Sequence, residues 1–580
     1  MKKIAQWEIK TPVEVANRDQ FPEVHPIVLQ LLWDRGLRTE AQIEEFLTPD
    51  YLEDVHDPFL FSRMVEAVDL LSGKIKAKEL VAIHGDYDAD GVTASVILAS
   101  TIRLLGGEAL VYLPHRETEG YGLSKKAIDY LARKGAFLLI TADCGISNRE
   151  EVEYAKSSGF TVIVTDHHEV PAVPPECILI HPRAPGEEYP FKYLTGGGVA
   201  FKFMQAILRT KSEEFGVKKE EAFAFEKWLL DLVAISTVAD MMPLLGENRT
   251  LVKYGLVVLA KSRRVGMKSL LERAGLLGGE KPAKLDADTI GFQIAPRINA
   301  AGRMDHANIA FELLMEESPV RAGELAEAIN KNNADRKDVV TRMMESAYRQ
   351  LGEVPLDARR VLSVYDSSWS LGVAGLVAGK LCQEFYLPSV VAADLDGKIA
   401  GSVRSIPGFN FVDMLWEMKG LFEKFGGHAA ACGFTLKNRA DWPIFQKKAS
   451  EFFFLKSRDS DVIPKLMIDQ EIPLREINWD LMGQLEQCEP FGKDNPRPVF
   501  ISRGVTVKSL DPIGNLGKHL RLSVFDGQKT TRKCIGFCFG HWCQTLKSGD
   551  KIDMVYEVGV NEWNGNRELQ LRIVDLKLGS

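Results

Sequence analysis

Three short apolar segments with the composition of β-strands are each followed directly by acidic residues, and this arrangement constrains the fold more than any other feature. The segments are LVAI before HGDYDADG (80–91), FLLITAD (137–143) and TVIVTD before two histidines (161–168). Amphipathic stretches separate them, so the sequence predicts a parallel sheet covered by helices. Ligands bind beyond the carboxyl ends of the strands in such sheets, so these polar groups should meet at one edge.

The sequence predicts a cluster of carboxylates and imidazoles at that edge. Its expected members are His84, Asp88, Asp90, Asp143, Asp166, His167, His168 and also Asp240, which ends the apolar run LVAISTVAD. Burying so many carboxylates together is costly unless cations balance their charge. Oxygen ligands with one or two imidazoles and no thiolate suit Mn²⁺ or Mg²⁺ better than structural zinc. A site for a pair of metal ions is therefore predicted.

The first acidic motif has two other interpretations. Asp86, Asp88 and Asp90 imitate the start of a calcium-binding EF-hand loop. That loop needs a bidentate Glu at its twelfth position, where this chain has Ile97, and it follows a helix rather than a strand. The calcium interpretation therefore fails. Taken alone, the motif could also be an Asp-rich turn that satisfies its own backbone.

The 580 residues are enough for roughly three to five domains. A second alternation of strand and helix patterns begins near residue 357, and short strand-like runs follow Pro464. Ser318 and Pro319 predict the cap and first residue of a helix that continues to about Leu351. The expected divisions are an N-terminal helical segment (1–55), a catalytic α/β domain (56–317), a connector helix (318–354), a second α/β domain (355–460) and a C-terminal β-barrel (461–580).

Composition and charge exclude several classes of protein. Hydrophobic residues make up 45% and charged residues 26%, which excludes a wholly disordered or collagen-like chain. A formal charge of −8 argues against a uniformly basic coat for duplex nucleic acid. No apolar run approaches the length of a membrane span, and no signal region follows the first lysines, so we expect a soluble, cytoplasmic protein. The eight scattered cysteines fit a reducing compartment.

In order and spacing, HGDYDADG, TADCG, TDHH and TVAD resemble the four motifs of the DHH phosphoesterase superfamily. Further along, APRINAAGR (295–303), GSVRS (401–405), FGGHAAACG (425–433) and EPFGKDNPRPVF (489–500) are similar to the RecJ family of bacterial exonucleases. The resemblance covers nearly the whole chain. It implies a multidomain α/β protein with a parallel-sheet DHH domain, a long connector helix, a DHH-associated α/β domain and a C-terminal oligonucleotide-binding (OB) barrel.

The resemblance also implies a set of metal ligands. These are His84, Asp88 and Asp143 around one Mn²⁺ or Mg²⁺ ion, and Asp90, Asp143, His167 and Asp240 around a second. Two cations about 3.5–4 Å apart activate a water and stabilise the leaving oxygen, with Asp143, His167 and His168 as catalytic residues. His168 should face the scissile phosphate, although an orienting or structural role is the alternative. Asp86 and Asp166 are expected to support the ligands or cap the backbone.

A second group of residues is expected to hold the substrate. The resemblance implies that Arg116, Arg303, Ser402 and Arg404 surround a terminal 5′-phosphate, for which guanidinium groups are well suited. His428 should lie close to them, and Arg297 is a further candidate. The alternative for each of these residues is an ordinary solvated surface position.

The C-terminal barrel is expected to contact an unpaired strand. Candidate contacts are Lys518, His519, Arg521, Arg532, Lys533 and Trp563, although these positions could equally be solubilising or core residues. Cys534, Cys538, His541 and Cys543 superficially suggest zinc. We favour a barrel core instead, because a strand through TRKCIGFCFG would place Cys534 and Cys538 on one face.

Two positions depart from the family pattern. Ser370 stands where relatives tend to have His, and Val403 stands where Gly is usual. Neither position belongs to the expected metal ligands.

The resulting expectation is an exonuclease that digests single-stranded DNA from its 5′ end and releases 5′-mononucleotides during recombination and repair. Expected partners are single-strand binding protein and a RecQ-type helicase, with no membrane. One alternative is a DHH-family phosphatase or oligonucleotidase acting on short nucleotides, against which the barrel argues. The other is a strand-binding relative whose metal cluster has decayed, against which the complete set of acidic residues argues.

Overall fold

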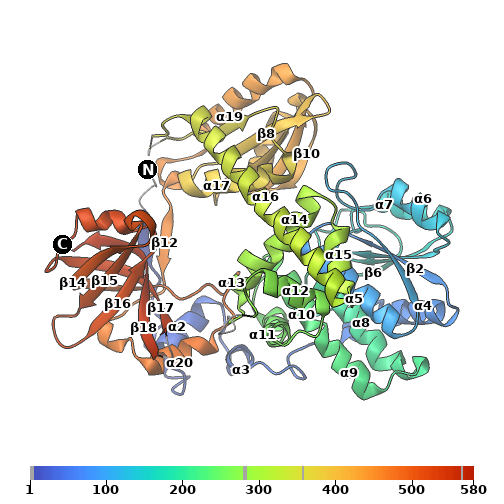
Figure 1. The fold of residues 1–580 in the computed structure, drawn as a ribbon, viewed down its shortest axis with the longest axis horizontal. Coiled ribbons are helices and arrows are strands. Elements are labelled where there is room, and N and C mark those ends of the chain that lie inside the picture. Colours follow the sequence, from blue (N-terminus) through green and yellow to red (C-terminus); the bar gives the residue numbers. More distant parts are fainter. Residues whose placement is uncertain (1–4, 279–283, 356–357, 564–565, 580) are drawn as a thin grey trace. The chain divides into compact units, whose positions relative to one another are not determined.

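The structure, a computed structural model, describes residues 5–278, 284–355, 358–563 and 566–579 (Figure 1). The chain forms two compact units, and each is built from segments that are distant in the sequence. The first unit comprises residues 55–242 and 251–464, and the second comprises residues 5–54, 243–250 and 465–580. The expected DHH domain, connector and second α/β domain thus share one unit, whereas the N-terminal segment belongs with the barrel. No described helix is long and apolar enough to cross a membrane.

A five-stranded parallel sheet lies at the centre of the DHH domain. Its strands, in spatial order, are β3 (Glu108–Tyr112), β2 (Leu80–Gly85), β4 (Leu138–Ala142), β5 (Thr161–Thr165) and β6 (Ile178–Ile180). Every residue of β4 is buried, as expected for a strand covered on both faces. The predicted parallel sheet is therefore confirmed, and the carboxyl ends of β2, β4 and β5 carry the acidic motifs.

Helices cover both faces of this sheet. They are α4 (Met64–Lys76), α5 (Ala89–Leu104), α6 (Lys125–Arg133), α7 (Arg149–Ser157) and α8 (Gly196–Lys211). On one face, Ile128 of α6 and Val152 of α7 pack against Leu139 and Val162 of the sheet. On the other, α5 contacts β2 and is itself covered by α8. Because α5 is surrounded, it is apolar on nearly all sides rather than amphipathic.

A helical region completes the DHH domain. Its helices are α9 (Lys219–Trp228), α10 (Leu230–Ala239), α11 (Gly246–Ala260), α12 (Val265–Arg273), α13 (Ala287–Thr289), α14 (Ala295–Met304) and α15 (Asn308–Met315). A π-helical turn (Ile290–Ile294) precedes α14. Helices α9 and α10 meet at Leu229.

The connector is α16 (Pro319–Leu351), whose 33 residues span about 50 Å. Ser318 caps it by accepting a hydrogen bond from the backbone N–H of Arg321, and Pro319 is its first residue, as the sequence predicted. The helix packs against α12, α14 and α15 and then against α17 (Leu371–Phe385) (Figure 1).

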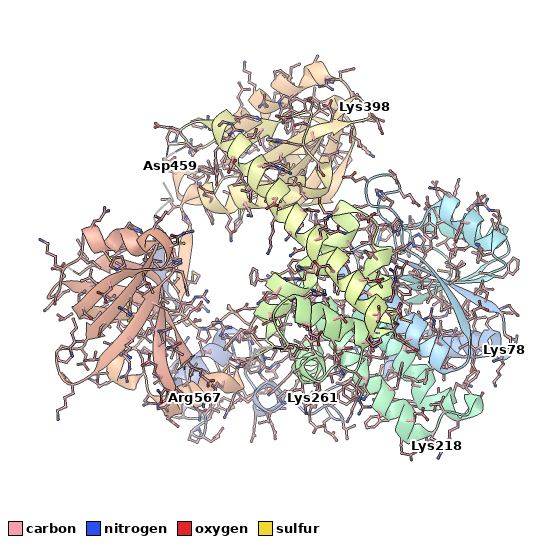
Figure 2. The ribbon with its side chains drawn as sticks, viewed as in Figure 1. Lys78, Lys218, Lys261, Lys398, Asp459 and Arg567 are labelled. Atoms are coloured by element: carbon pink, nitrogen blue, oxygen red, sulfur yellow. The ribbon has the colours of Figure 1, made fainter. Side chains whose placement is uncertain are left out.

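The second α/β domain has a mixed five-stranded sheet. Its order is β10 (Phe422–His428), β11 (Ala431–Leu436), β9 (Lys398–Arg404), β8 (Ser389–Leu395) and β7 (Leu362–Tyr365). Only β7 and β8 are parallel. Lys398, labelled in Figure 2, begins β9. Helices α17, α18 (Phe411–Glu417) and α19 (Trp442–Lys456) pack on the sheet around a phenylalanine-rich core.

The second unit contains a closed five-stranded barrel, which confirms the predicted C-terminal barrel. The strands follow each other around it as β14 (Phe500–Ile513), β15 (His519–Phe525), β16 (Thr531–Gly536), β18 (Asn566–Leu578) and β17 (Lys551–Trp563), and β17 pairs back to β14. The pairing is antiparallel except between β16 and β18. Helix α20 (Trp479–Gln487) packs against the core, and β13 (Gln470–Glu471) extends the sheet beside β14.

Two further segments belong to this unit. The N-terminal segment contributes α1 (Val15–Arg18), α2 (Pro26–Asp34) and α3 (Glu40–Leu47), and also β1 (Gln6–Ile9), which the sequence did not predict. Strand β1 pairs in parallel with β12 (Lys465–Ile468). From residues 243–250, the buried Arg249 donates hydrogen bonds to backbone carbonyls of Phe46 and of residues 487–490.

Candidate active site

The acidic loop after β2 is shaped by the start of α5. Asp88 caps this helix, because its Oδ1 accepts the backbone N–H groups of Asp90 at 2.9 Å and Gly91 at 3.2 Å. A Cβ on Gly91 would approach the backbone N of Asp86 to 2.6 Å, so only glycine fits this close turn. The backbone N–H of Ala89 donates to Asn299 Oδ1 at 2.8 Å, which ties the loop to α14.

The Asp90 carboxylate faces the N-terminus of α8. Its two oxygens accept the backbone N–H groups of Gly196 at 2.8 Å and Gly197 at 2.7 Å. Ser236 of α10 donates to the same carboxylate at 2.5 Å. An anion at a helix N-terminus is stabilised by the helix dipole and by otherwise unpaired N–H groups, so Asp90 is held in one orientation.

Asp143 follows β4 in the left-handed backbone region, with φ of 63°. Few residues other than glycine adopt this conformation, and it turns the carboxylate out of the line of the strand. A Cβ on Gly196 would lie 2.6 Å from Asp143 Oδ1, so α8 begins directly against this side chain. Gly196 and Gly197 were not among the predicted site residues, and the run of three glycines at 196–198 was the available signal.

The Asp166 carboxylate organises the two histidines that follow it. Asp166 accepts the backbone N–H groups of His167 at 2.7 Å, His168 at 3.1 Å and Ile146 at 2.9 Å. It also lies 2.8 Å from His168 Nδ1. Burial lowers the pKa of His168, but Asp166 outweighs it and raises that pKa to about 9. Burial likewise works against ionisation of Asp166, whose pKa is nevertheless lowered to about 2 because of His168.

His167 Nε2 lies at the centre of the cluster. It is 3.1 Å from Asp143 Oδ1 and 3.6 Å from carboxylate oxygens of both Asp90 and Asp240. Asp240 caps the C-terminal end of α10, and Met241 after it adopts positive φ. Among the described residues, three groups have ligand atoms close enough to share a cation: Asp143 with His167 and His168, Asp90 with His167 and Asp240, and Asp86 with Asp88 and Asp143.

The buried atoms of this cluster lack partners that a divalent cation would supply. Within the described part of the chain, no hydrogen bond reaches His84 Nε2, Asp86 Oδ1, Asp143 Oδ1 or either ring nitrogen of His167. Orphaned buried polar atoms are rare in native proteins. The carboxylate oxygens, and one ring nitrogen of each neutral imidazole, are lone-pair donors of the kind that Mn²⁺ and Mg²⁺ accept. The residues present therefore fit a divalent-metal site.

Electrostatics lead to the same conclusion. Burial raises the pKa of Asp143 well above its usual value, and the charges of Asp90 and Asp88 raise it further. For the same reasons the pKa of Asp240 is raised to about 8. Burial lowers the pKa of His84 and of His167 to about 4, which keeps both imidazoles neutral. Neutral imidazoles and crowded carboxylates are ready to bind a cation, which would relieve the repulsion.

Three predicted anchor arginines meet where the two α/β domains of the first unit touch. Arg116 lies over the ring of Tyr87 at 4.7 Å, and Arg303 donates to the backbone carbonyl of Gly372 at 2.8 Å. Burial lowers the pKa of Arg303 to about 10, and the positive charge of Arg116 contributes. Burial also lowers the pKa of Arg404, and Arg116 acts in the same direction. Such mutual repulsion between arginines favours the binding of an anion.

Ser402 and Arg404 lie two residues apart on β9, on the face of the strand toward α17. A Cβ on Gly375 of that helix would lie 2.9 Å from Ser402 Oγ and 3.1 Å from Arg404 Nη2, so glycine leaves them room. Sequence reasoning missed Arg336 of α16, whose charge also lowers the pKa of Arg303. Its Nε is buried without a hydrogen-bond partner among the described residues. Arg336 lies in a polar segment of the helix, where the sequence pattern does not distinguish it from ordinary surface residues.

The other two candidates for substrate binding are placed differently. Arg297 donates to Asn330 and to the backbone carbonyl of Gln293, and none of the described contacts joins it to the anchor arginines. His428 ends β10 with its side chain exposed. Strand register aligns it with Ala431 of β11, which is in turn aligned with Arg404 of β9. His428 and Arg404 are therefore two strands apart, about 10 Å across the sheet.

Comparisons with known proteins agree with this architecture. Residues 80–237 match the DHH family N-terminal domain, residues 358–453 the DHHA1 domain and residues 468–575 the RecJ OB domain. The chain is 35% identical to the single-stranded-DNA-specific exonuclease RecJ of Bacillus subtilis over 98% of its own length and 70% of that protein. It is 32% identical to the RecJ of Dickeya dadantii over 96% and 97%.

The chain belongs to the RecJ family of single-stranded-DNA-specific exonucleases. Its structure is similar to that of RecJ from Thermus thermophilus in complex with Mn²⁺, with a TM-score of 0.83, 27% identity and coverage of 99% of this chain and 80% of the other. A structure of the same RecJ with Mg²⁺ is also similar, with a TM-score of 0.76. These matches confirm the predicted RecJ domain set and a metal-dependent hydrolase.

Several candidate strand contacts of this RecJ-family barrel are already engaged within the protein. Arg521 pairs with Asp511 and Lys533 with Glu568. Arg532 is partly buried and donates to the Ile477 carbonyl. The ring of His519 accepts the backbone N–H of Cys538 at 3.0 Å. Of the other two candidates, Lys518 precedes β15, and the side chain of Trp563 lies outside the described residues.

The cysteines of the barrel differ from one another. Cys534 is buried in the core, as predicted. Cys538 was expected on the same face, but β16 ends at Gly536 and Cys538 is exposed with φ of 66°. The prediction for Cys538 was wrong because the strand pattern was extended through a turn. The described residues contain no group of these cysteines with His541 that is close enough to hold a metal.

Proposed function

We propose that this RecJ-family chain hydrolyses single-stranded DNA from its 5′ end and releases 5′-mononucleotides during recombination and repair. The observation that carries the proposal is the arrangement of two sites within one compact unit. A carboxylate and imidazole cluster suited to divalent cations lies at the sheet edge, and a group of arginines lies where the DHH domain meets the second α/β domain.

We assign the cluster to two divalent cations, Mn²⁺ or Mg²⁺. His84, Asp88 and Asp143 would hold one, and Asp90, Asp143, His167 and Asp240 the other; Asp86 is close enough to Asp143 to contribute. When bound, the pair would activate a water for in-line attack and stabilise the departing oxygen. Asp143, which would contact both cations, and His167, which would contact one, are thus the residues that we place nearest the reacting groups. We place His168 toward the scissile phosphate, oriented by Asp166.

Polarity would come from the arginine group. Arg116, Arg303 and Arg404, with Ser402, would hold the terminal 5′-phosphate, and Arg336 would add a further positive charge. Guanidinium groups bind phosphate in a fixed orientation, so the first phosphodiester bond would be positioned at the metal cluster. His428 is assigned a contact further along the same sheet. Arg297 of α14, which donates to Asn330 of α16 and to the backbone carbonyl of Gln293, is assigned a supporting role.

We infer a division of labour along the chain. The DHH domain (56–317) would carry the chemistry, the connector (318–354) would fix the second α/β domain (355–460) beside it, and the OB barrel (461–580) would guide the strand. The N-terminal segment (1–55) would support the barrel, because its residues 5–54 share a compact unit with the barrel. The proposed setting is the cytoplasm, with single-strand binding protein and a RecQ-type helicase supplying unpaired strands.

A phosphatase or oligonucleotidase acting on short nucleotides is the second candidate. Such an enzyme would use the same metal cluster, but a dinucleotide is too short to need a strand-binding barrel. The 35% and 32% identity to RecJ exonucleases over nearly the whole chain, barrel included, also favours the exonuclease.

The test is product analysis on an oligonucleotide labelled at its 5′ end, with Mn²⁺, Mg²⁺ or chelator, beside the corresponding blunt duplex. The expected result is immediate, metal-dependent release of labelled mononucleotide from the single strand alone. Label released only from dinucleotides would support the phosphatase. Binding without cleavage under any cation would overturn both.

A further inference from the structure

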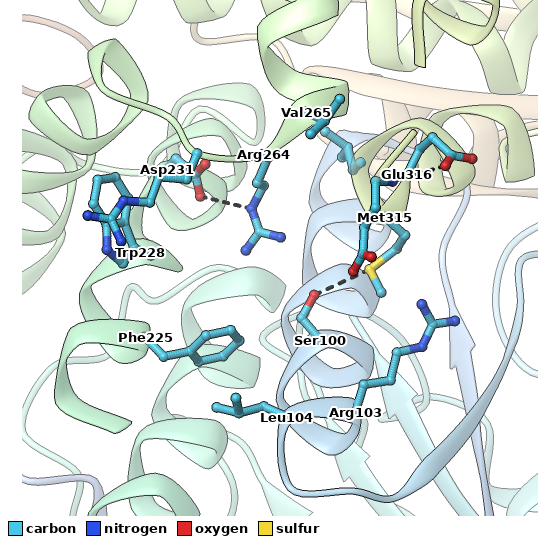
Figure 3. Close-up of a pocket in the computed structure, with 13 residues that line it drawn as sticks. Ser100, Arg103, Leu104, Phe225, Trp228, Asp231, Arg264, Val265, Met315 and Glu316 are labelled. Carbon is cyan, nitrogen blue, oxygen red and sulfur yellow. Dashed lines mark hydrogen bonds and ion pairs between the residues drawn. The ribbon is translucent and has the colours of Figure 1, made fainter. Parts of the chain in front are cut away.

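A cavity of about 550 Å³ lies within the DHH domain among α5, α9, α10, α12 and α15 (Figure 3). It is separate from the metal cluster and from the arginine group described above, since it shares no residue with either. Its size falls within the range of about 300–1,000 Å³ that is usual for sites binding small organic molecules. Its lining combines aromatic and cationic side chains, which makes it more than a packing defect.

One wall of the cavity is apolar and aromatic. Phe225 and Trp228 of α9, Leu104 of α5 and Met315 of α15 contribute to it. Figure 3 shows the ring of Phe225 directed into the space beside Leu104. Both aromatic side chains are only partly buried although the surrounding helices are packed. A half-covered aromatic ring in a concave site is suited to stack on a flat ring of a ligand.

Three arginines lie around the same space. Arg103 is exposed at the last turn of α5, and no hydrogen bond or ion pair joins its guanidinium to another described residue. Arg263 lies over the Trp228 ring at 4.2 Å. Arg264 points into the cavity, and only its Nε approaches a carboxylate, that of Asp231 at 3.5 Å. The terminal nitrogens of Arg264 and the whole Arg103 guanidinium are thus free to bind an anion.

The acidic residues at this site are largely engaged. Asp231 is buried and accepts from Ser262 as well as lying beside Arg264. Glu316 accepts the backbone N–H groups of Glu317 and Ser318 at the start of α16. Only Glu317 remains exposed at the rim. The cavity therefore offers free positive charge next to an aromatic wall, which matches a ligand with a planar ring and a negatively charged group.

We propose that this cavity binds a nucleoside monophosphate, with its base against Phe225 and Leu104 and its phosphate between Arg103 and Arg264. This ligand supplies both features that the lining calls for. A nucleoside monophosphate is also the product of the proposed reaction. Its identification as a reaction product rests on the proposed function, whereas the existence of the binding site does not.

Two of the helices that border the cavity also reach the metal cluster. Helix α5 carries Asp90 in its first turn and Arg103 in its last, and α10 carries Asp231 in its first turn and is capped by Asp240. At a rise of 1.5 Å per residue, the cavity lies roughly 15–20 Å from the metal ligands. A nucleotide that binds the cavity more tightly in one arrangement of α5 and α10 would act on turnover through these helices.

The test is calorimetric titration of the full-length protein with deoxyadenosine monophosphate in the presence of chelator, so that no metal contributes. We expect saturable binding that Arg103→Glu weakens by about tenfold or more, since the substitution places a carboxylate against the phosphate. Arg133→Glu is the matched control, because Arg133 is also exposed in the last turn of a helix, α6, but lies outside the cavity. It should leave binding unchanged.

Arg404→Ala separates this site from the phosphate anchor. Binding that survives Arg404→Ala but not Arg103→Glu supports the cavity. Binding lost in Arg404→Ala and retained in Arg103→Glu, or no binding at all, overturns it. The titration needs no turnover, so it can detect binding in the cavity even if the exonuclease assay shows no cleavage. Conversely, cleavage without binding in the cavity would support the proposed function and overturn this inference.

Discussion

Replacing Gly196 with alanine tests whether the close approach of α8 to Asp143 is needed for activity. The added Cβ would lie 2.4 Å from the Asp143 Cβ and 2.6 Å from its Oδ1. Carbon atoms in contact are normally about 3.5–4.0 Å apart, so the carboxylate or the helix start must move by about 1 Å. A displacement of about 1 Å at a catalytic group lowers the rate roughly a hundredfold. Overpacking of this kind also destabilises a protein by about 1–3 kcal/mol.

The assay is the initial rate of label release from a 5′-labelled single strand across a series of Mn²⁺ concentrations, with thermal unfolding measured in parallel. We expect a rate about a hundredfold lower for Gly196→Ala, together with a higher Mn²⁺ requirement. The control is Gly73→Ala on α4, where the added methyl meets nothing within 4 Å and should stabilise the helix by about 0.5–1 kcal/mol. A Gly196→Ala variant with the wild-type rate and metal requirement would refute the idea that activity depends on the close contact between the start of α8 and the Asp143 carboxylate.

Three further substitutions probe other parts of the chain. Asp143→Ala should abolish turnover, because both proposed metal sites would lose a ligand, while gel-shift binding of a single strand is largely retained; an unchanged rate would contradict the proposed shared ligand. Arg404→Ala should reduce the rate preference for 5′-phosphorylated over unphosphorylated strands by about tenfold, since one guanidinium of the anchor is lost; an unaltered preference would exclude it from the anchor. Arg249→Met should lower the free energy of unfolding by about 3–5 kcal/mol in urea titrations, because buried carbonyls at 46 and 487–490 lose their charged donor; a loss below about 1 kcal/mol would show that water replaces it.

Much of the catalytic region was predictable because strand ends are marked in the sequence. Asp143 and Asp166 each follow an apolar strand, and parallel strands bring their carboxyl ends to one edge. The start of the connector at Ser318 and Pro319 was predictable for a similar reason, since capping chemistry is local. Residues whose role is set by their immediate neighbours in sequence could thus be found without a structure.

The remainder depends on contacts between distant segments. Gly196 was not recognised because its role is to make room for Asp143, which lies 53 positions earlier. Arg336 sits in a polar helix, and nothing in that pattern indicates the neighbouring Arg303. Strand β1 is only four residues long and exists because β12 pairs with it. The error at Cys538 arose from the opposite cause, a local turn that interrupts an apparently continuous strand.

The second unit is assembled from three separated stretches of chain, and this has a consequence for how the protein is made. Its N-terminal stretch ends at Asp54 and its barrel stretch begins at Lys465. At about 5–20 residues per second, a ribosome needs roughly 20–80 s to synthesise the approximately 400 residues between them. During that interval Phe46 and the apolar side chains of α2 lack the barrel residues that bury them in the finished protein. We therefore expect this N-terminal stretch to finish folding only after the barrel residues that cover it have been made.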